Sequence, residues 1–250
     1  MHVRARPYWL PKGGNPSEDY EDAYWPEGQV DREVGRFRCA VADGAAETSF
    51  SRLWAQMLVC AWGRGHLGRR HFHTKIPELQ RQWLAEVTAR PLPWYAEEKL
   101  RSGAFAALVG LHIADGRQAN GNAWHALAVG DACLFQFREG ELITSCPLTQ
   151  ADQFGIRPWL LSSNGGQDDE VVDYYHMPSG RWRTGDTFYL MTDALACWYL
   201  TAPADGTDLD IVTARDDPRA AATFSAWICS LRDSGGLRND DITLLRVDVG

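Results

Sequence analysis

The hydrophobic positions of the chain follow two different spacings. Apolar residues alternate with polar or small ones over Phe37–Val41, which predicts a half-buried strand that ends at Asp43-Gly44. Apolar residues then recur at helical spacing from Phe50 to Gly63, where the glycine provides a stop signal. A second helical pattern predicts a helix from Pro77 to about Arg90.

The remainder of the chain is rich in strand signals. The predicted strands are Ala104–Ile113, Ala123–Val129, Cys133–Arg138, Thr187–Thr192 and Ile242–Val249. Helices are expected near Leu195–Leu200 and from Pro218 to Leu231, and the polar stretch Gln150–Asp169 is the natural candidate for a flap. This order lacks the regular alternation of a parallel doubly wound sheet. It predicts an α+β fold in which antiparallel sheets carry helices on their outer faces.

Composition narrows the class of protein. The chain has 250 residues, 45% hydrophobic residues and a net charge of −8, which suits one soluble domain spanning residues 1–250. The negative charge argues against a general nucleic-acid binder. No apolar run reaches membrane-spanning length and the first residues do not resemble a secretory signal, so a cytoplasmic location without membrane attachment is expected. Six scattered cysteines without a CxxC pair indicate buried thiols in a reducing compartment.

Acidic residues stand at the boundaries of the predicted elements. They are Glu21-Asp22, Asp43, Asp131, Asp193 and Asp240-Asp241. Strands from distant parts of a chain can bring their ends together at one edge of a sheet, where such carboxylates would repel one another unless cations were present. Oxygen ligands of this kind suit Mg²⁺ or Mn²⁺ rather than Zn²⁺. Taken singly, each residue has a simpler interpretation: Asp-Gly is a common turn dipeptide, Asp131 suits a hairpin turn, and Asp193 suits a helix N-cap.

One further pair of residues could suggest a metal site. His71-Phe72-His73 places two imidazoles at strand spacing, but no cysteine or acidic partner lies near and Arg69-Arg70 would disfavour a cation. We interpret this segment as solvated surface.

Five short motifs, in this order, resemble those of the protein phosphatase 2C family over nearly the whole chain. They are Glu21-Asp22-Ala23, Ala40–Gly44, Val129–Ala132, Leu190–Ala194 and Asp240–Thr243. The resemblance implies a sandwich of two antiparallel β-sheets flanked by helix pairs, in α-β-β-α layers. It also implies a metal-dependent protein phosphatase that hydrolyses phosphoserine and phosphothreonine with a metal-activated water. Its expected partners are a phosphorylated protein and a cognate kinase or the targets of that kinase.

Residue roles follow from the same resemblance. Asp43, Asp193 and Asp240, with the carbonyl of Gly44, are expected to hold two Mn²⁺ or Mg²⁺ ions. Asp22 is expected to act from behind these ligands by holding a water, and Asp131 to contribute to a third ion.

The chain also departs from the family pattern. Ala45-Ala46-Glu47 replaces the usual glycines after Asp-Gly, and Asp241 replaces the usual Asn. The Arg expected to bind substrate phosphate is missing, and Lys12 is a candidate replacement as a point charge. These departures keep a second hypothesis open: a catalytically weak pseudophosphatase that binds phosphoproteins as a regulatory module.

Overall fold

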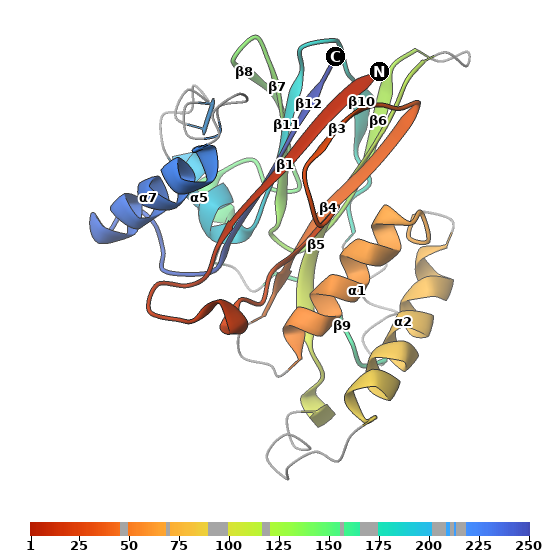
Figure 1. The fold of residues 1–250 in the computed structure, drawn as a ribbon. Coiled ribbons are helices and arrows are strands. Elements are labelled where there is room, and N and C mark those ends of the chain that lie inside the picture. The colour runs from red at the N-terminus through yellow and green to blue at the C-terminus, as the bar shows by residue number, and fades with distance from the viewer. Residues whose placement is uncertain are drawn as a thin grey trace.

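The computed structural model describes residues 1–45, 50–68, 71–89, 100–116, 121–155, 158–165, 175–201, 209–210, 213 and 219–250. Ala46 and Glu47 lie outside this set, as do Arg69-Arg70 and part of the expected flap. Within it, two antiparallel β-sheets face each other and helices cover their outer faces (Figure 1). The α+β fold class predicted from the sequence is therefore confirmed.

The first sheet has six strands and contains both ends of the chain. Its order is β3 (Val30–Glu33), β1 (His2–Leu10), β12 (Ile242–Val249), β11 (Thr187–Met191), β7 (Cys133–Arg138) and β8 (Glu141–Cys146). β12 is central and is buried along its whole length. The predicted strands 133–138 and 242–249 match β7 and β12 residue for residue.

The second sheet packs against the first. Its order is β10 (Ser179–Arg181), β6 (Ala123–Val129), β5 (Phe105–Ala114), β4 (Arg36–Gly44) and β2 (Ala23–Trp25), with β9 (Leu161–Ser162) paired to one end of β5. The predicted strand 123–129 matches β6, and β4 ends at the predicted Asp-Gly pair.

Three apolar clusters build the layers. The central one joins the inner faces of the two sheets, with residues such as Val41 and Leu245. A second cluster packs the other face of β4 and β5 against α1 (Ser51–Gly63) and α2 (Phe72–Val87). A third packs the first sheet against α5 (Asp193–Thr201) and α7 (Ala220–Asp233). Because sheet residues alternate in direction, each sheet contributes to two clusters, which gives the α-β-β-α order.

Three strands at the start of the chain were not predicted from the sequence. β1 to β3 precede the strand that ends at Asp43-Gly44. The proline-rich composition of the first residues concealed β1, which contains Pro7. β3 pairs only with residues 2–5 of β1, so Pro7 lies where β1 has a single partner strand, and such positions tolerate a residue without an N–H.

The second helix begins earlier than predicted. The prediction placed its start at Pro77 because proline favours the first helical turn. In the structure, α2 begins at Phe72 and includes Pro77 in its interior. Phe72 and Ile76 are both buried against the second sheet, and this packing outweighs the cost of the proline. His71 and His73 therefore have helical rather than strand spacing, and both are exposed as expected for solvated surface.

The six cysteines are free thiols, of which Cys39, Cys133 and Cys146 are buried. Cys229 is exposed on α7 and so departs from the expectation that the thiols are buried. Among the described residues, no helix is both long enough and apolar enough to cross a bilayer.

Candidate active site

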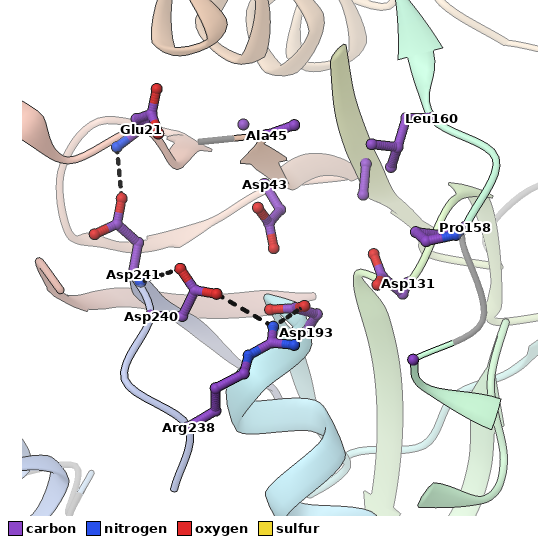
Figure 2. Close-up of a pocket in the computed structure, with 13 residues that line it drawn as sticks. Glu21, Asp43, Ala45, Asp131, Pro158, Leu160, Asp193, Arg238, Asp240 and Asp241 are labelled. Carbon is purple, nitrogen blue, oxygen red and sulfur yellow. Dashed lines mark hydrogen bonds and ion pairs between the residues drawn. The ribbon is translucent and has the colours of Figure 1, made fainter. Parts of the chain in front are cut away.

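A cavity of about 330 Å³ lies where strand ends of the two sheets meet, and its wall is acidic. Its charged lining residues are Glu21, Asp43, Asp131, Asp193, Arg238, Asp240 and Asp241. We call it the acidic pocket. Figure 2 shows the carboxylates of Asp43, Asp131, Asp193 and Asp240 around one space. The sequence prediction that these four residues come together is therefore met by the geometry.

Asp43 enters the pocket from the end of β4, and Gly44 allows another segment to approach it. A Cβ added to Gly44 would lie 2.6 Å from the carbonyl oxygen of Glu21 and 3.2 Å from Ser51. Only a residue without a side chain leaves room for this contact. Gly44 thus brings the loop before β2 and the start of α1 against the end of β4.

Asp131 enters from the turn between β6 and β7, which belong to different sheets. Gly130 before it has φ +83°, a conformation that suits glycine, and a Cβ there would lie 2.7 Å from Ala107. The glycine before Asp131 is therefore needed both to turn the chain and to let it pack against β5.

Asp193 and Asp240 enter from the first sheet and share a guanidinium. Asp193 is the first residue of α5, directly after β11, and Asp240 precedes β12. Arg238 donates to Asp193 and lies 3.3 Å from a carboxylate oxygen of Asp240 (Figure 2). It is the single cationic side chain among the described residues that line the pocket.

Asp22 lies behind the pocket wall rather than in it. It is 2% exposed and accepts a 2.6 Å hydrogen bond from the hydroxyl of Thr243 on β12. Thr243 in turn is 2.5 Å from the hydroxyl of Tyr20. This buried chain of groups fixes the carboxyl of Asp22 relative to β12, behind the aspartates that line the pocket.

Asp241 joins two loops through both of its carboxylate oxygens. One accepts the backbone N–H of Lys12 and the other the backbone N–H of Glu21, each at 2.7 Å. An asparagine has a single acceptor oxygen and could satisfy only one of them. The departure from the usual Asn therefore has a structural explanation in this chain.

Lys12 lies close to the acidic residues although it does not line the pocket. Its positive charge acts on Asp240, and its backbone is held by Asp241. Arg232 of α7 donates to the carbonyl of Pro11 at 3.0 Å and to that of Asp240 at 2.5 Å. The segment that contains Lys12 is thus fastened to the loop before β12.

The electrostatics of the pocket disfavour negative charge in the absence of cations. Burial raises the pKa of Asp43 well above its usual value, and repulsion from Asp22, Asp193, Asp131 and Asp240 raises it further. Burial, with Asp193 and Asp240, raises the pKa of Asp131 to about 7. The pKa of Asp240 is also raised, first by burial and then by Asp193. Clustered carboxylates with raised pKa values are typical of functional sites.

The donor chemistry fits hard divalent cations. The pocket offers carboxylate oxygens and the backbone of Gly44, with no thiol or imidazole among the described lining residues, and this set suits Mg²⁺ or Mn²⁺. In the described part of the chain, no three acidic, histidine or cysteine side chains converge closely enough to hold an ion as they stand. Arg238 forms ion pairs with both Asp193 and Asp240 in this arrangement.

Sequence reasoning missed Arg238 and the role of Asp241. Arg238 lies two residues before Asp240 in the loop that leads into β12. Its place next to the acidic motif was therefore the sequence feature that could have pointed to it. The expected flap was found only in part: Gly155, Pro158 and Leu160 of the segment 150–169 line the pocket.

No family profile and no curated protein matches the sequence. Solved structures do match its fold. PppA, a regulatory component of the type VI secretion system in Pseudomonas aeruginosa, superposes with a TM-score of 0.60 at 18% identity over 100% of this chain and 99% of its own. The Mycobacterium tuberculosis serine/threonine phosphatase PstP/Ppp gives 0.59 at 17% over 100% and 99%. The catalytic domain of PstP with two manganese ions gives 0.56 at 18% over 99% and 100%. This chain therefore has the fold of the protein phosphatase 2C family.

Proposed function

We propose that this protein is a Mn²⁺- or Mg²⁺-dependent phosphatase that hydrolyses phosphoserine and phosphothreonine in proteins. The observation that carries the proposal is the acidic pocket. Four aspartates far apart in sequence surround one cavity at the junction of the two sheets, and burial together with the neighbouring carboxylates raises the pKa values of Asp43, Asp131 and Asp240. Such an arrangement costs stability unless cations bind, so a metal-dependent function explains why it exists.

Each aspartate has a role in this proposal. Asp43, Asp193 and Asp240, with the carbonyl of Gly44, would hold two ions, and Asp131 would contribute to a third. Two divalent cations, when bound, polarise phosphoryl oxygens and lower the pKa of a water molecule. Asp22 would accept a hydrogen bond from a water behind the ligands while Thr243 keeps its carboxyl in place.

Recognition of the substrate phosphate requires a positive group. Lys12 and Arg238 are the candidates, since Lys12 acts electrostatically on Asp240 and Arg238 lines the pocket. Arg238 is 56% exposed, so it can move away from Asp193 and Asp240 when cations take its place. Its planar fork then suits two phosphate oxygens better than the point charge of Lys12. This leaves Lys12 as the secondary candidate.

The proposed substrate is a phosphorylated protein, and the proposed regulatory partner is a cognate kinase or the targets of that kinase. Two findings support this class. Structural neighbours include serine/threonine phosphatases, and one comes from work on the bacterial stressosome. Pro158 and Leu160 also add apolar surface to the wall of the acidic pocket, which a peptide segment of the substrate could contact.

The decisive experiment is hydrolysis of a phosphothreonine peptide by metal-stripped protein, with and without added Mn²⁺. Phosphate release should appear only with the metal and should saturate with metal concentration. A folded sample that stays inactive with Mn²⁺ and with Mg²⁺ would contradict the proposal.

The second hypothesis, a pseudophosphatase that binds phosphoproteins without turnover, is favoured by one observation. Arg238 already supplies a cation to Asp193 and Asp240, as an internal counter-ion would. Calorimetric titration with Mn²⁺ separates the two hypotheses. The phosphatase should bind at least two ions per chain, and replacing Arg238 with Gln should strengthen that binding, because a competing positive charge is removed. Absence of divalent-ion binding in both proteins would favour the pseudophosphatase.

A further inference from the structure

A second cavity, of about 370 Å³, lies toward the other end of β4, beside the C-terminal end of α1. Its basic lining residues are Arg32 of β3, Arg36 and Arg38 of β4, and His112 of β5. We call it the basic pocket. Arg38 and His112 are direct cross-strand partners. Arg36 and Arg38 are two residues apart on β4, so both lie on the sheet face that Ala40 presents to the helices.

The positive charge of the basic pocket is not neutralised by the protein. Within the described residues, none of Arg32, Arg36 and Arg38 forms an ion pair. Burial lowers the pKa of Arg38, and the charge of Arg36 lowers it further. Burial, followed by Arg38, His125 and Arg36, lowers the pKa of His112 to about 4. Three arginines without an ion-pair partner among the described residues thus lie together, although the chain has a net charge of −8.

Arg38 has an unused donor in this cavity. Its guanidinium lies 5.0 Å from the ring centroid of Trp62, so stacking explains why the side chain is held there. Its Nη1 atom, however, is buried and has no hydrogen-bond partner among the described residues. A buried donor of a charged group without an acceptor is costly, and most such groups in folded proteins are satisfied. Stacking alone therefore leaves this atom unexplained, while a rotation of the guanidinium toward an anion in the cavity would give it an acceptor.

The remaining wall of the cavity is apolar and aromatic. Trp25 and Pro26 line it together with the glycine at the end of α1, Gly63. A cavity of this size accepts a small organic molecule, and aromatic walls with a few polar groups are typical of such sites. Two neighbouring guanidinium groups match the oxygens of a phosphate group.

We infer that the basic pocket binds a small phosphorylated molecule, whose phosphate group contacts Arg36 and Arg38 and whose remaining part packs against Trp25. This site is separate from the acidic pocket. Arg38 and Asp43 are five residues apart on one extended strand, which corresponds to about 16 Å. The inference goes beyond the proposed function, because a ligand here would not be the phosphoprotein that is hydrolysed.

Calorimetry on metal-stripped protein tests the inference, with adenosine monophosphate and inorganic phosphate as probes and adenosine as the phosphate-free control. We expect one site per chain for a phosphate-bearing probe and no binding of adenosine at equal concentration. Arg36→Gln should weaken binding at least tenfold, because one charged contact is lost. Arg38→Lys should weaken it similarly, because the fork that reaches the phosphate is lost while the charge is kept.

Two control variants make the result specific. Arg183 is an exposed arginine outside the cavity, so Arg183→Gln should leave binding unchanged despite the same change in net charge. Arg238→Gln should also leave it unchanged, since that residue lines the acidic pocket, and a loss of binding in this variant would place the phosphate there instead. Circular dichroism verifies that Arg36→Gln, at an exposed position, is folded. Lack of binding by both phosphate-bearing probes at millimolar concentration, or equal affinities in wild type, Arg36→Gln and Arg38→Lys, would overturn the inference.

Discussion

Two carboxylates in this protein, the completely buried Asp186 and the partly buried Asp43, have pKa values shifted in opposite directions. Burial raises the pKa of Asp186, but hydrogen bonds from Arg138, the backbone of Arg183 and Gln136 outweigh burial, so its pKa lies below the usual value. Burial raises the pKa of Asp43 as well, and its neighbours are further carboxylates that add to the shift. The difference lies in the partners and not in the depth of burial.

This contrast separates groups kept for stability from groups kept for function. Asp186 is completely buried and accepts hydrogen bonds of 2.8 and 2.7 Å from Arg138, 2.8 Å from Gln136 and 2.9 Å from the N–H of Arg183. All its neighbours lower the free energy of the charged form. The acidic pocket instead gathers several carboxylates around the single guanidinium of Arg238, and the repulsion among them destabilises the metal-free fold. A cluster of that kind persists where function requires it.

The largest expected effect is on turnover. Asp193→Asn should lower phosphopeptide hydrolysis more than about 1,000-fold, since removal of a group behind a metal ligand already costs about 10- to 100-fold. The unfolding midpoint should change little, and steady-state kinetics with saturating Mn²⁺ measures the loss. Asp233→Asn, at an exposed position at the end of α7, is the matched control and should keep full activity. Equal rates for the two variants would remove Asp193 from the active site.

The next effect is on stability. Asp186→Asn should reduce the free energy of unfolding by about 3 kcal/mol, because Arg138 loses its partner while the amide offers donors where acceptors are needed. Urea denaturation at pH 7 measures the difference. Asp31→Asn is the control: Asp31 is 59% exposed, so its contacts with Arg4 and His2 are screened by solvent and the variant should unfold at nearly the wild-type urea concentration.

The pH dependence of the Asp186→Asn effect has a defined sign. A carboxyl group with a lowered folded-state pKa stabilises the fold above its unfolded-state pKa of about 3.9, and this contribution is lost as the pH falls through the folded-state value. The gap between wild type and Asp186→Asn should therefore stay constant from pH 7 to about pH 5 and narrow below about pH 4. A gap that widened in acid would contradict the assignment.

A smaller effect is expected at Asp241. Asp241→Asn leaves one of the backbone N–H groups of Lys12 and Glu21 without an acceptor, which should cost about 1 kcal/mol of unfolding free energy. The segment that contains Lys12 should also become more open to proteolysis. Unchanged stability and unchanged cleavage would show that the second carboxylate oxygen is dispensable.

The last substitution should raise the stability of the metal-free protein instead of lowering it. Asp43→Asn should stabilise the metal-free protein by about 1 kcal/mol, or about 3 °C in the unfolding midpoint, because it relieves repulsion in the acidic pocket. Added Mn²⁺ should stabilise the wild type and not the variant, so the order of the two melting temperatures should reverse. Destabilisation of the metal-free variant would show that Asp43 has a compensating partner.

The sequence predicted strands best where nearly every position is buried. β6, β7 and β12 are largely or completely buried, so each appears in the sequence as a short run rich in apolar residues whose limits could be predicted. β1 could not, because Pro7 and several charged residues hide a strand whose partner, β12, lies at the other end of the chain. The start of α2 was missed because burial of Phe72 depends on tertiary packing.

The candidate site was predictable to the extent that it consists of strand ends. Asp43, Asp131, Asp193 and Asp240 each follow or precede a recognisable strand, so antiparallel topology brings them together. Arg238 could not be assigned in the same way, since a loop arginine carries no periodic signal and its partners are known only from the fold. The two acceptor bonds of Asp241 likewise depend on loops separated from it by more than 200 residues.

The proposed ligands in the acidic pocket are divided between the two sheets. Asp43 belongs to β4 of the second sheet, Asp193 and Asp240 adjoin β11 and β12 of the first, and Asp131 lies on the connection from one to the other (Figure 1). An ion shared by these residues would act as a cross-link between two layers that otherwise meet through apolar side chains. Metal loading should therefore slow hydrogen exchange of β4 and β12 amides together, and leave β8, at the far edge, exchanging as before.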